Sequence, residues 1–190
     1  MNRSWLVFLF FLAALSGFAQ APSALEGTIT AVLMDHIQIK SDDGTTHLVV
    51  LPAGVSVTKR LTVTWSDIHA GDWVGVDSKP GADGTQESVA INIFSPSIIA
   101  KVRKGQFTMA SGDLMTNAAV DQVTKGAGGA SLVLKNDDAM VAVKITDQTT
   151  VHRLVDAAAA DLKPGLKVGV RGTVNADASL QAANVLIAGT

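Results

Sequence analysis

The sequence predicts an all-β protein made of two tandem small antiparallel OB-like β-barrels with a long connector, behind an N-terminal signal peptide. Three observations support this. The segment 67–76, Asp-Ile-His-Ala-Gly-Asp-Trp-Val-Gly-Val, recurs as 161–170, Asp-Leu-Lys-Pro-Gly-Leu-Lys-Val-Gly-Val, 94 residues later. Short runs alternate apolar and polar residues with many β-branched side chains, which is typical of strands. An unbroken apolar run opens the chain.

Residues 1–19 have the features of a secretory signal peptide. Arg3 and the α-amino group are positive, and the apolar run 5–15 is followed by small residues. Cleavage after Ala19 places Gly17 at the −3 position. An uncleaved membrane anchor is the alternative, although the run is short for a span of ~20 residues. No later apolar segment is long enough to cross a bilayer as a helix, so we expect a periplasmic or secreted protein.

Composition narrows the classes of function. The chain has 190 residues, of which 47% are hydrophobic and 17% charged, which is the composition of a globular protein. It has no cysteine, so disulfides and thiolate metal sites are excluded. Its formal net charge is −2 and it has no tyrosine. OB-like barrels that bind single-stranded nucleic acid use stacking aromatics and a basic groove, so we predict no nucleic-acid partner.

The first barrel is predicted over residues 25–94. Residues 27–33 and 37–40 alternate as strands, and the next strand runs through 48–51. Between them lies 41–44, Ser-Asp-Asp-Gly, and Asp-Gly between alternating runs is a strong hairpin signal. The chain therefore opens with a strand followed by a hairpin.

The rest of this unit continues in the same style. A short strand begins at Val55, and the range 64–68 suits a helical or 3₁₀ turn with Thr64 as a possible N-cap. A strand over 73–78, a long turn at 80–84 and a last strand over 89–93 complete it. One helical turn among several short strands fits a small barrel.

The second barrel is predicted over residues 118–190, because the order of elements repeats. The matching positions are Leu132 and Leu134 with Ile37 and Ile39, Val151 with Val57, Asp177 with Asp83, and Val185 and Ile187 with Ile91 and Ile93. We therefore expect residues 20–94 and 118–190 to share one strand order. Closing each unit into a barrel removes exposed edges. A pair of open sheets around one sandwich-like core is the alternative.

The connector spans residues 95–117 and has no counterpart in the repeats. An extra strand is expected within 98–102, and the only dense basic patch of the chain lies here, at Lys101, Arg103 and Lys104. Long ordered loops are often functional. A structural role in holding the barrels together is equally open.

Several motifs resemble a β-barrel domain of unknown function found in exported bacterial proteins. They are Gly-x-Ile-x-x-Val, Ile-x-Ile-x-x-x-Asp-Gly, Asp-Ile/Leu-x-x-Gly-Asp-x-Val-x-Val and Asp-Gly-x-x-x-x-x-Ala-x-x-Ile. The resemblance covers 25–94 well and 120–187 less well, because Gly44, Asp72 and Gly84 become Ala139, Leu166 and Ala178. The connector, with Gly-Gln-Phe-x-Met at 105–109 and Met-Thr-Asn at 115–117, resembles a two-domain subgroup. Some relatives carry the label of a metal transporter permease, an activity that requires several spanning helices. The resemblance implies a fold and a compartment, and no established activity.

We predict that the protein is not an enzyme, with no catalytic residues and no cofactor. A nucleophilic hydrolase needs a nucleophile, a base and a group that orients the base. The chain has no cysteine and no Gly-x-Ser-x-Gly motif. Its histidines, at positions 36, 47, 69 and 152, stand outside any catalytic motif. They are better explained as solvated strand or loop residues.

Two methionines in the connector are the candidate metal ligands. Met109 and Met115 offer thioethers, which suit copper(I), although filling of a core is the other role for methionine. The acidic turns, at residues 42–43, 83, 137–138 and 177, lack the spacing of an EF-hand and are explained by turn chemistry.

Trp73, Phe107 and Asn117 are the candidate partner-binding residues. Trp73 is replaced by Lys167 in the second copy, which points to an exposed position, and the other two belong to the connector. The sequence therefore predicts an exported binding or scaffold module whose partner is an envelope protein or a small ligand. The competing hypothesis is a periplasmic accessory protein that handles copper or another divalent metal. The oligomeric state stays open.

Overall fold

The computed structural model describes residues 23–81, 85–126, 129–136 and 139–189. The predicted signal peptide and the acidic turns at 83 and 137–138 lie outside these residues. No helix within the described ranges is both long enough and apolar enough to span a membrane.

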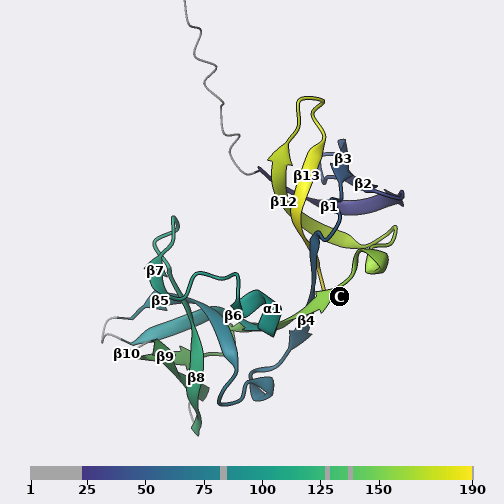
Figure 1. Ribbon diagram of the computed structural model, residues 1–190. Helices are drawn as coiled ribbons and strands as arrows, with labels where there is room; N and C mark the ends of the chain where they lie inside the picture. Colours follow the sequence, from purple (N-terminus) through teal and green to yellow (C-terminus); the bar gives the residue numbers. More distant parts are fainter. Residues whose placement is uncertain (1–22, 82–84, 127–128, 137–138, 190) are drawn as a thin grey trace, which may run out of the picture.

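The protein is all-β, as predicted. The strands are β1 (Ser23–Val32), β2 (His36–Lys40), β3 (Thr46–Val50), β4 (Ser56–Val63), β5 (Trp73–Pro80), β6 (Gln86–Phe94), β7 (Gly105–Thr108), β8 (Leu114–Gly126), β9 (Gly129–Asn136), β10 (Ala139–Ile145), β11 (Thr150–Ala157), β12 (Lys167–Val174) and β13 (Leu180–Ile187). The helical elements are η1 (Trp65–Asp67), α1 (Pro96–Ile99) and η2 (Ala159–Asp161). Figure 1 shows two lobes, joined by β4 and β11.

Period-two alternation explains the strands locally. Ile37 and Ile39 on β2 are fully buried, while the residues between and after them are partly or fully exposed. The Asp-Gly turn that follows forms as predicted, because Gly44 adopts a φ of 87° and Asp43 accepts a hydrogen bond from the backbone N–H of Thr45 at 2.8 Å. Positive φ favours glycine. The hairpin β2–β3 is therefore encoded by its own residues.

Three elements recur at the 94-residue spacing seen in the sequence. The bounds of β4 and β11, of η1 and η2, and of β5 and β12 all differ by 94. The helical turns are stabilised alike, since the N–H of Thr64 donates to Asp67 and the N–H of Ala158 donates to Asp161, each at 2.8 Å. Thr64 is the N-cap residue, as predicted, and the carboxylate three residues later satisfies its N–H.

Barrel I consists of β1, β2, β3, β13 and β12, in that order around the barrel. All its neighbours are antiparallel except β3 and β13, whose short parallel pairing closes the circuit at Leu180↔Val49 and Gln181↔Val50. Its core joins Ile29, Ile37 and Ile39 to apolar residues from beyond position 160.

Barrel II consists of β8, β9, β10, β6 and β5, and has the same arrangement. The parallel contact of β10 with β6, at Val143↔Gln86 and Lys144↔Glu87, closes this circuit. Its core includes Val74 and Val76 from β5 and Leu132 and Leu134 from β9. Closed barrels exclude the alternative of open sheets, and the parallel closures correct the expectation of purely antiparallel barrels.

Neither barrel corresponds to a contiguous segment of the chain. The predicted ranges 25–94 and 118–190 each supply strands to both barrels. The reason is geometric: β4 is an extended strand of 8 residues, about 27 Å long, whose first half pairs with β13 of barrel I and whose second half leads the chain out of that barrel instead of folding it back. Strands β5 and β6 therefore close with β8–β10, and strands β12 and β13 return to β1–β3.

The two linking strands pair around an approximate two-fold axis. In the antiparallel β4–β11 ladder, Arg60 lies opposite Leu154, and these residues are separated by the repeat spacing of 94. The parallel flanking pairs match as well, since β11–β6 pairs Val151↔Ile91 and β13–β4 pairs Val185↔Val57. The two halves of this single chain are therefore arranged like the two subunits of a strand-exchanged dimer.

The connector contains more regular secondary structure than predicted, and its first part is helical where a strand was expected. Residues 96–99 form α1 instead of the strand expected within 98–102, because Pro96 begins the turn and the N–H groups of Ile98 and Ile99 both donate to the carbonyl of Ser95. The later part forms β7, which pairs with β8. Strand β8 begins at Leu114, so the expected boundary at residue 118 lies inside it.

Candidate functional site

Strands β5 and β8 of barrel II, together with β7 at the edge of β8, bring the predicted site residues onto one surface. The register pairs Trp73 with Ala119 between β5 and β8, and Phe107 with Met115 between β7 and β8. Because side chains alternate along a strand, Val74 enters the core while Trp73 points outward. We call the outward side of β5, β8 and β7 the connector face. It carries Trp73, Gly75, Asp77, Phe107, Met109, Met115 and Asn117.

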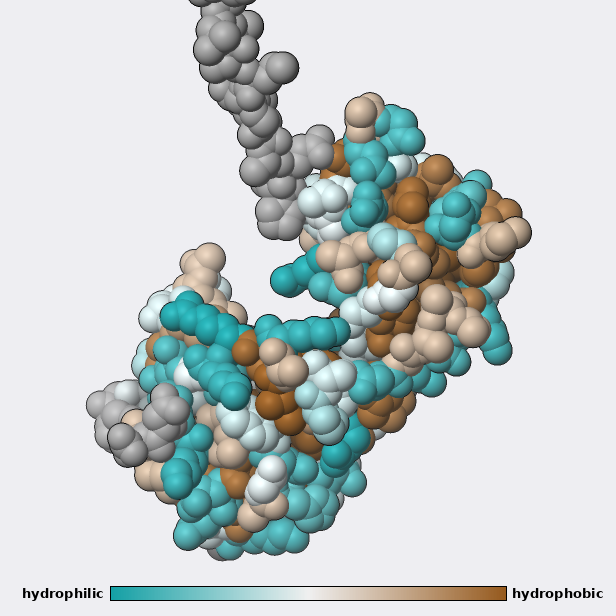
Figure 2. Space-filling model, in the orientation of Figure 1, coloured by the Kyte–Doolittle hydropathy of each residue, from teal (hydrophilic) through white to brown (hydrophobic). Residues whose placement is uncertain are grey.

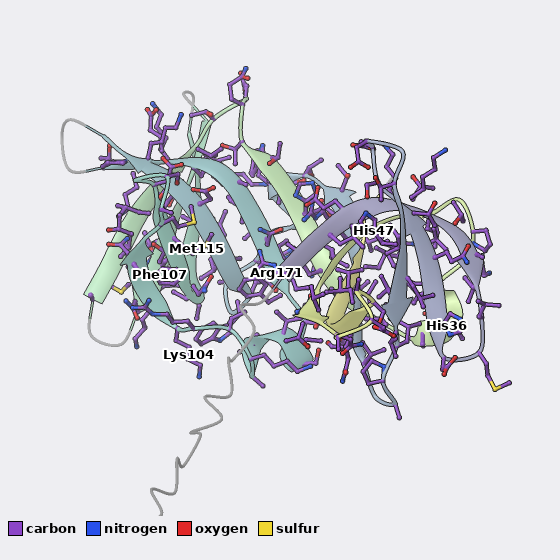
Figure 3. The ribbon with its side chains drawn as sticks, turned by 90° about the horizontal axis from the view of Figure 1, so that it is seen from above. His36, His47, Lys104, Phe107, Met115 and Arg171 are labelled. Atoms are coloured by element: carbon purple, nitrogen blue, oxygen red, sulfur yellow. The ribbon has the colours of Figure 1, made fainter. Side chains whose placement is uncertain are left out.

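The basic patch of the connector folds over the aromatic rings of this face. The guanidinium carbon of Arg103 lies 4.4 Å from the centroid of the Phe107 ring, and Lys104 Nζ lies 5.1 Å from the centroid of the Trp73 ring. Both distances are within the range of cation–π attraction. Figure 3 shows Lys104, Phe107 and Met115 on the same side of barrel II. The structure therefore joins two features that the sequence shows as separate.

Asn117 holds the connector in place from below. The residue is only 6% exposed, and its Nδ2 donates to the carbonyl oxygen of Arg103 at 2.7 Å. Its Oδ1 has no hydrogen-bond partner within the described residues and lies against Gly75, where a Cβ atom would come within 2.7 Å of it. Asn117 thus positions Arg103, and little of its own surface is exposed.

Asp77 makes the neighbouring part of the face polar. Burial raises the pKa of its carboxyl group, nearby Asp113 raises it further, and Lys79 opposes the shift. One carboxylate oxygen is buried and has no hydrogen-bond partner among the described residues. Partial loss of hydration therefore disfavours the ionised form of this carboxyl group.

The two candidate metal ligands share this face. Met115 is opposite Phe107, and the N–H of Met109 donates to the carbonyl of Asp113 at 2.8 Å, which extends the hairpin by one more pair. Met109 and Met115 are therefore diagonal neighbours, a relation that places side chains ~7–8 Å apart. Both side chains are partly exposed. Further metal ligands do not gather around them, because no group of three or more His, Cys, Asp or Glu residues capable of holding a metal occurs in the described ranges.

The histidines are not brought together. His36 contacts Asp35 at 2.7 Å, and His69 Nδ1 lies 3.9 Å from Asp72 Oδ2. Burial, with a smaller effect of the Arg60 charge, lowers the pKa of His152. In Figure 3, His36 and His47 lie on the lobe away from the connector face.

A second cation–aromatic pair on barrel II serves as a reference for the first. Lys125 Nζ lies 5.1 Å from the centroid of the Trp65 ring, the same distance as in the Lys104–Trp73 pair. Sequence reasoning missed both pairs, because Lys104 and Lys125 are each far from their tryptophan along the chain. The clustering of Lys101, Arg103 and Lys104 was the available signal for the first pair, and none existed for the second.

The chain was compared with protein-family models, with curated proteins and with solved structures, and none of these matches it. Figure 2 shows the surface hollowed between the two lobes, with hydrophilic residues along the lower side of the hollow.

Proposed function

We propose that the protein is an exported, non-catalytic binding or scaffold module whose two barrels are OB-like. Its connector face binds an acidic segment of an envelope protein, in the periplasm or outside the cell. The signal-like residues 1–19 support export. The closure of each barrel from five strands, with one short parallel pairing, supports the OB-like description.

One observation carries the binding proposal: two cations are stacked on two aromatic rings of the same exposed surface. Protein interfaces are enriched in Trp, Phe, Met and Arg, and hot spots concentrate in Trp, Tyr and Arg. Arg103 and Trp73 sit with Phe107 and Met115 on the connector face. Stacking also holds the cationic side chains in place before a partner arrives, which lowers the entropic cost of binding.

Site-specific photo-crosslinking tests this function. A benzoylphenylalanine at position 107, in the exported protein in its native cells, is expected to give a discrete adduct with one envelope protein. The double variant Arg103→Glu, Lys104→Glu is expected to reduce the yield of that adduct at least tenfold, because it reverses the charge presented to an acidic partner.

Two matched controls belong to this experiment. Lys125→Glu changes an equivalent cation over Trp65 and is expected to leave the yield unchanged. A crosslinker at Met140, which is 53% exposed on β10, is expected to give no such adduct. Equal loss in Lys125→Glu, or no discrete adduct at position 107, would contradict the proposal.

The placement of Met109 and Met115 on one face supports a second candidate, a metal-handling accessory function. Thermal unfolding of the chelated protein with Cu(I), Cu(II), Zn, Ni, Mn and Ca tests it. A site filled at 100-fold above its dissociation constant stabilises a protein by ~2.7 kcal/mol, which raises the midpoint by roughly 5–10 °C for a chain of this size. The shift is expected to disappear in Met109→Ala and Met115→Ala. Absence of a shift with every metal would remove this candidate.

A further inference from the structure

The approximate two-fold axis relates β7, which pairs with β8 of barrel II, to a position beside β1 of barrel I. The equivalence follows from the ladders: Leu25 pairs with Val170, Thr116 pairs with Val76, and Val76 and Val170 are separated by the repeat spacing of 94. Residues 23–26 of β1 therefore correspond to residues 114–117 of β8. Those four residues of β8 are the ones that pair with β7.

In barrel I the corresponding edge has a partner strand on one side only. Residues 23–28 of β1 pair with β12, and β2 joins β1 only from Thr28 onward. Within the described parts of the chain, no strand pairs with the other side of residues 23–26. Such an edge presents unpaired N–H and C=O groups, which are a template for an added strand.

Burial at equivalent positions agrees with a missing strand. Thr116, which is paired with Gln106 of β7, is fully buried and accepts a hydrogen bond from Gln106 Nε2 at 2.8 Å. Its counterpart Leu25 is partly exposed, although it packs against the core of barrel I. An apolar side chain at the end of the barrel is thus left partly uncovered where barrel II is covered.

The outward side chains indicate the charge of the added strand. Arg171 on β12 occupies the place that Asp77 has on β5, and it is exposed beside the exposed Ala24. Lys167 is exposed on the same side of β12, while Glu26 lies between the two cations. Figure 3 places Arg171 on the side of barrel I nearest barrel II. A side chain of an added strand that lies next to the small Ala24 would therefore have room and would lie close to the positive charge of Arg171.

We propose that residues 23–26 of β1 are a strand-addition site for an extended acidic segment of another protein. The incoming strand runs antiparallel to β1, as β7 runs against β8, with an apolar residue beside Leu25 and an acidic residue beside Ala24 and Arg171. Backbone hydrogen bonds supply the affinity and the side chains supply the selectivity in this mode of recognition. The site lies on barrel I and does not depend on the connector face.

Amide hydrogen exchange of the full-length protein tests the site. The probe is the peptide Ser-Thr-Gly-Val-Glu-Thr-Met, which in the register of β7 places its valine opposite Leu25 and its glutamate opposite Ala24, beside Arg171. It is expected to slow exchange of edge amides within residues 23–26 at least tenfold. The matched peptide Ser-Thr-Gly-Val-Lys-Thr-Met, with lysine in place of the glutamate, is expected to bind at least tenfold more weakly, and Arg171→Glu is expected to reverse this preference.

A blocking variant makes the interpretation specific. Residues 103–113 are inserted between Pro22 and Ser23, so that the chain supplies its own strand as it does before β8. This variant is expected to bind neither peptide. Binding that survives the insertion would overturn the proposal, as would edge amides that are already protected without peptide, or no protection with the acidic peptide. Arg103→Glu, Lys104→Glu is expected to leave peptide binding unchanged, which separates this site from the connector face.

Discussion

Two fragments, residues 1–100 and 101–190, are expected to fold together and not as separate monomers. Each barrel takes strands from both fragments, so β1–β3 have no closing strands without β12 and β13. An incomplete barrel exposes strand edges and core side chains such as Ile37 and Ile39, which are fully buried in the intact protein. The cut lies after α1 and leaves every strand intact.

Circular dichroism and size exclusion of the separate and mixed fragments check this expectation. The mixture is expected to give a 1:1 complex with a cooperative thermal transition. Either fragment alone is expected to be unfolded, or to fold only as a dimer in which two copies exchange strands about the two-fold axis. A folded monomer of either fragment would show that the halves are independent domains and would contradict the exchanged topology.

Leu134→Ala is expected to destabilise the barrel that contains both Trp65 and Trp73, although it lies in the other half of the sequence. Leu134 is fully buried in the core of barrel II. Truncation of a buried leucine costs about 2–5 kcal/mol of unfolding free energy. In a Trp5→Phe background, the denaturant midpoint followed by tryptophan fluorescence is therefore expected to fall.

Ile39→Ala is the matched control, since Ile39 is fully buried at the corresponding position of barrel I. This substitution also lowers the free energy of unfolding by removing buried apolar atoms. The denaturant midpoint followed by tryptophan fluorescence is nevertheless expected to move much less, because barrel I contains neither Trp65 nor Trp73. Circular dichroism, which reports both barrels, is expected to detect both variants. The opposite pattern of fluorescence, with Ile39→Ala dominant, would place the tryptophans in the same folding unit as Ile39.

The local structure was largely predictable, because its causes are local. Alternation with a period of two marks β2 and β5, and an Asp-Gly turn specifies the β2–β3 hairpin through Asp43 and Gly44. The helical turn after β4 follows from Thr64 and Asp67, which satisfy each other. The expected strand at 98–102 was wrong because Pro96 and the carbonyl of Ser95 favour a helical turn over an apolar run.

The candidate site was predictable in its residues and not in its arrangement. Trp73 and Phe107 were visible as unusual positions, but their neighbours depend on the register of three strands from distant segments. The stacking of Arg103 and Lys104 over these rings needs the connector to fold back on β8. The burial of Asn117 and its hydrogen bond to the carbonyl oxygen of Arg103 follow from the same fold.

The sequence by itself determined the strands, the turns and the order in which they recur. Only the tertiary structure decided which copy of each strand closes which barrel. The two copies carry nearly the same apolar pattern, so β5 and β12 are similar partners for β1 and β8, and pairing energies from the pattern hardly distinguish them. The extended path of β4 and β11, which pair through Arg60 and Leu154, separates the barrels and makes the exchanged closure the one the chain can reach.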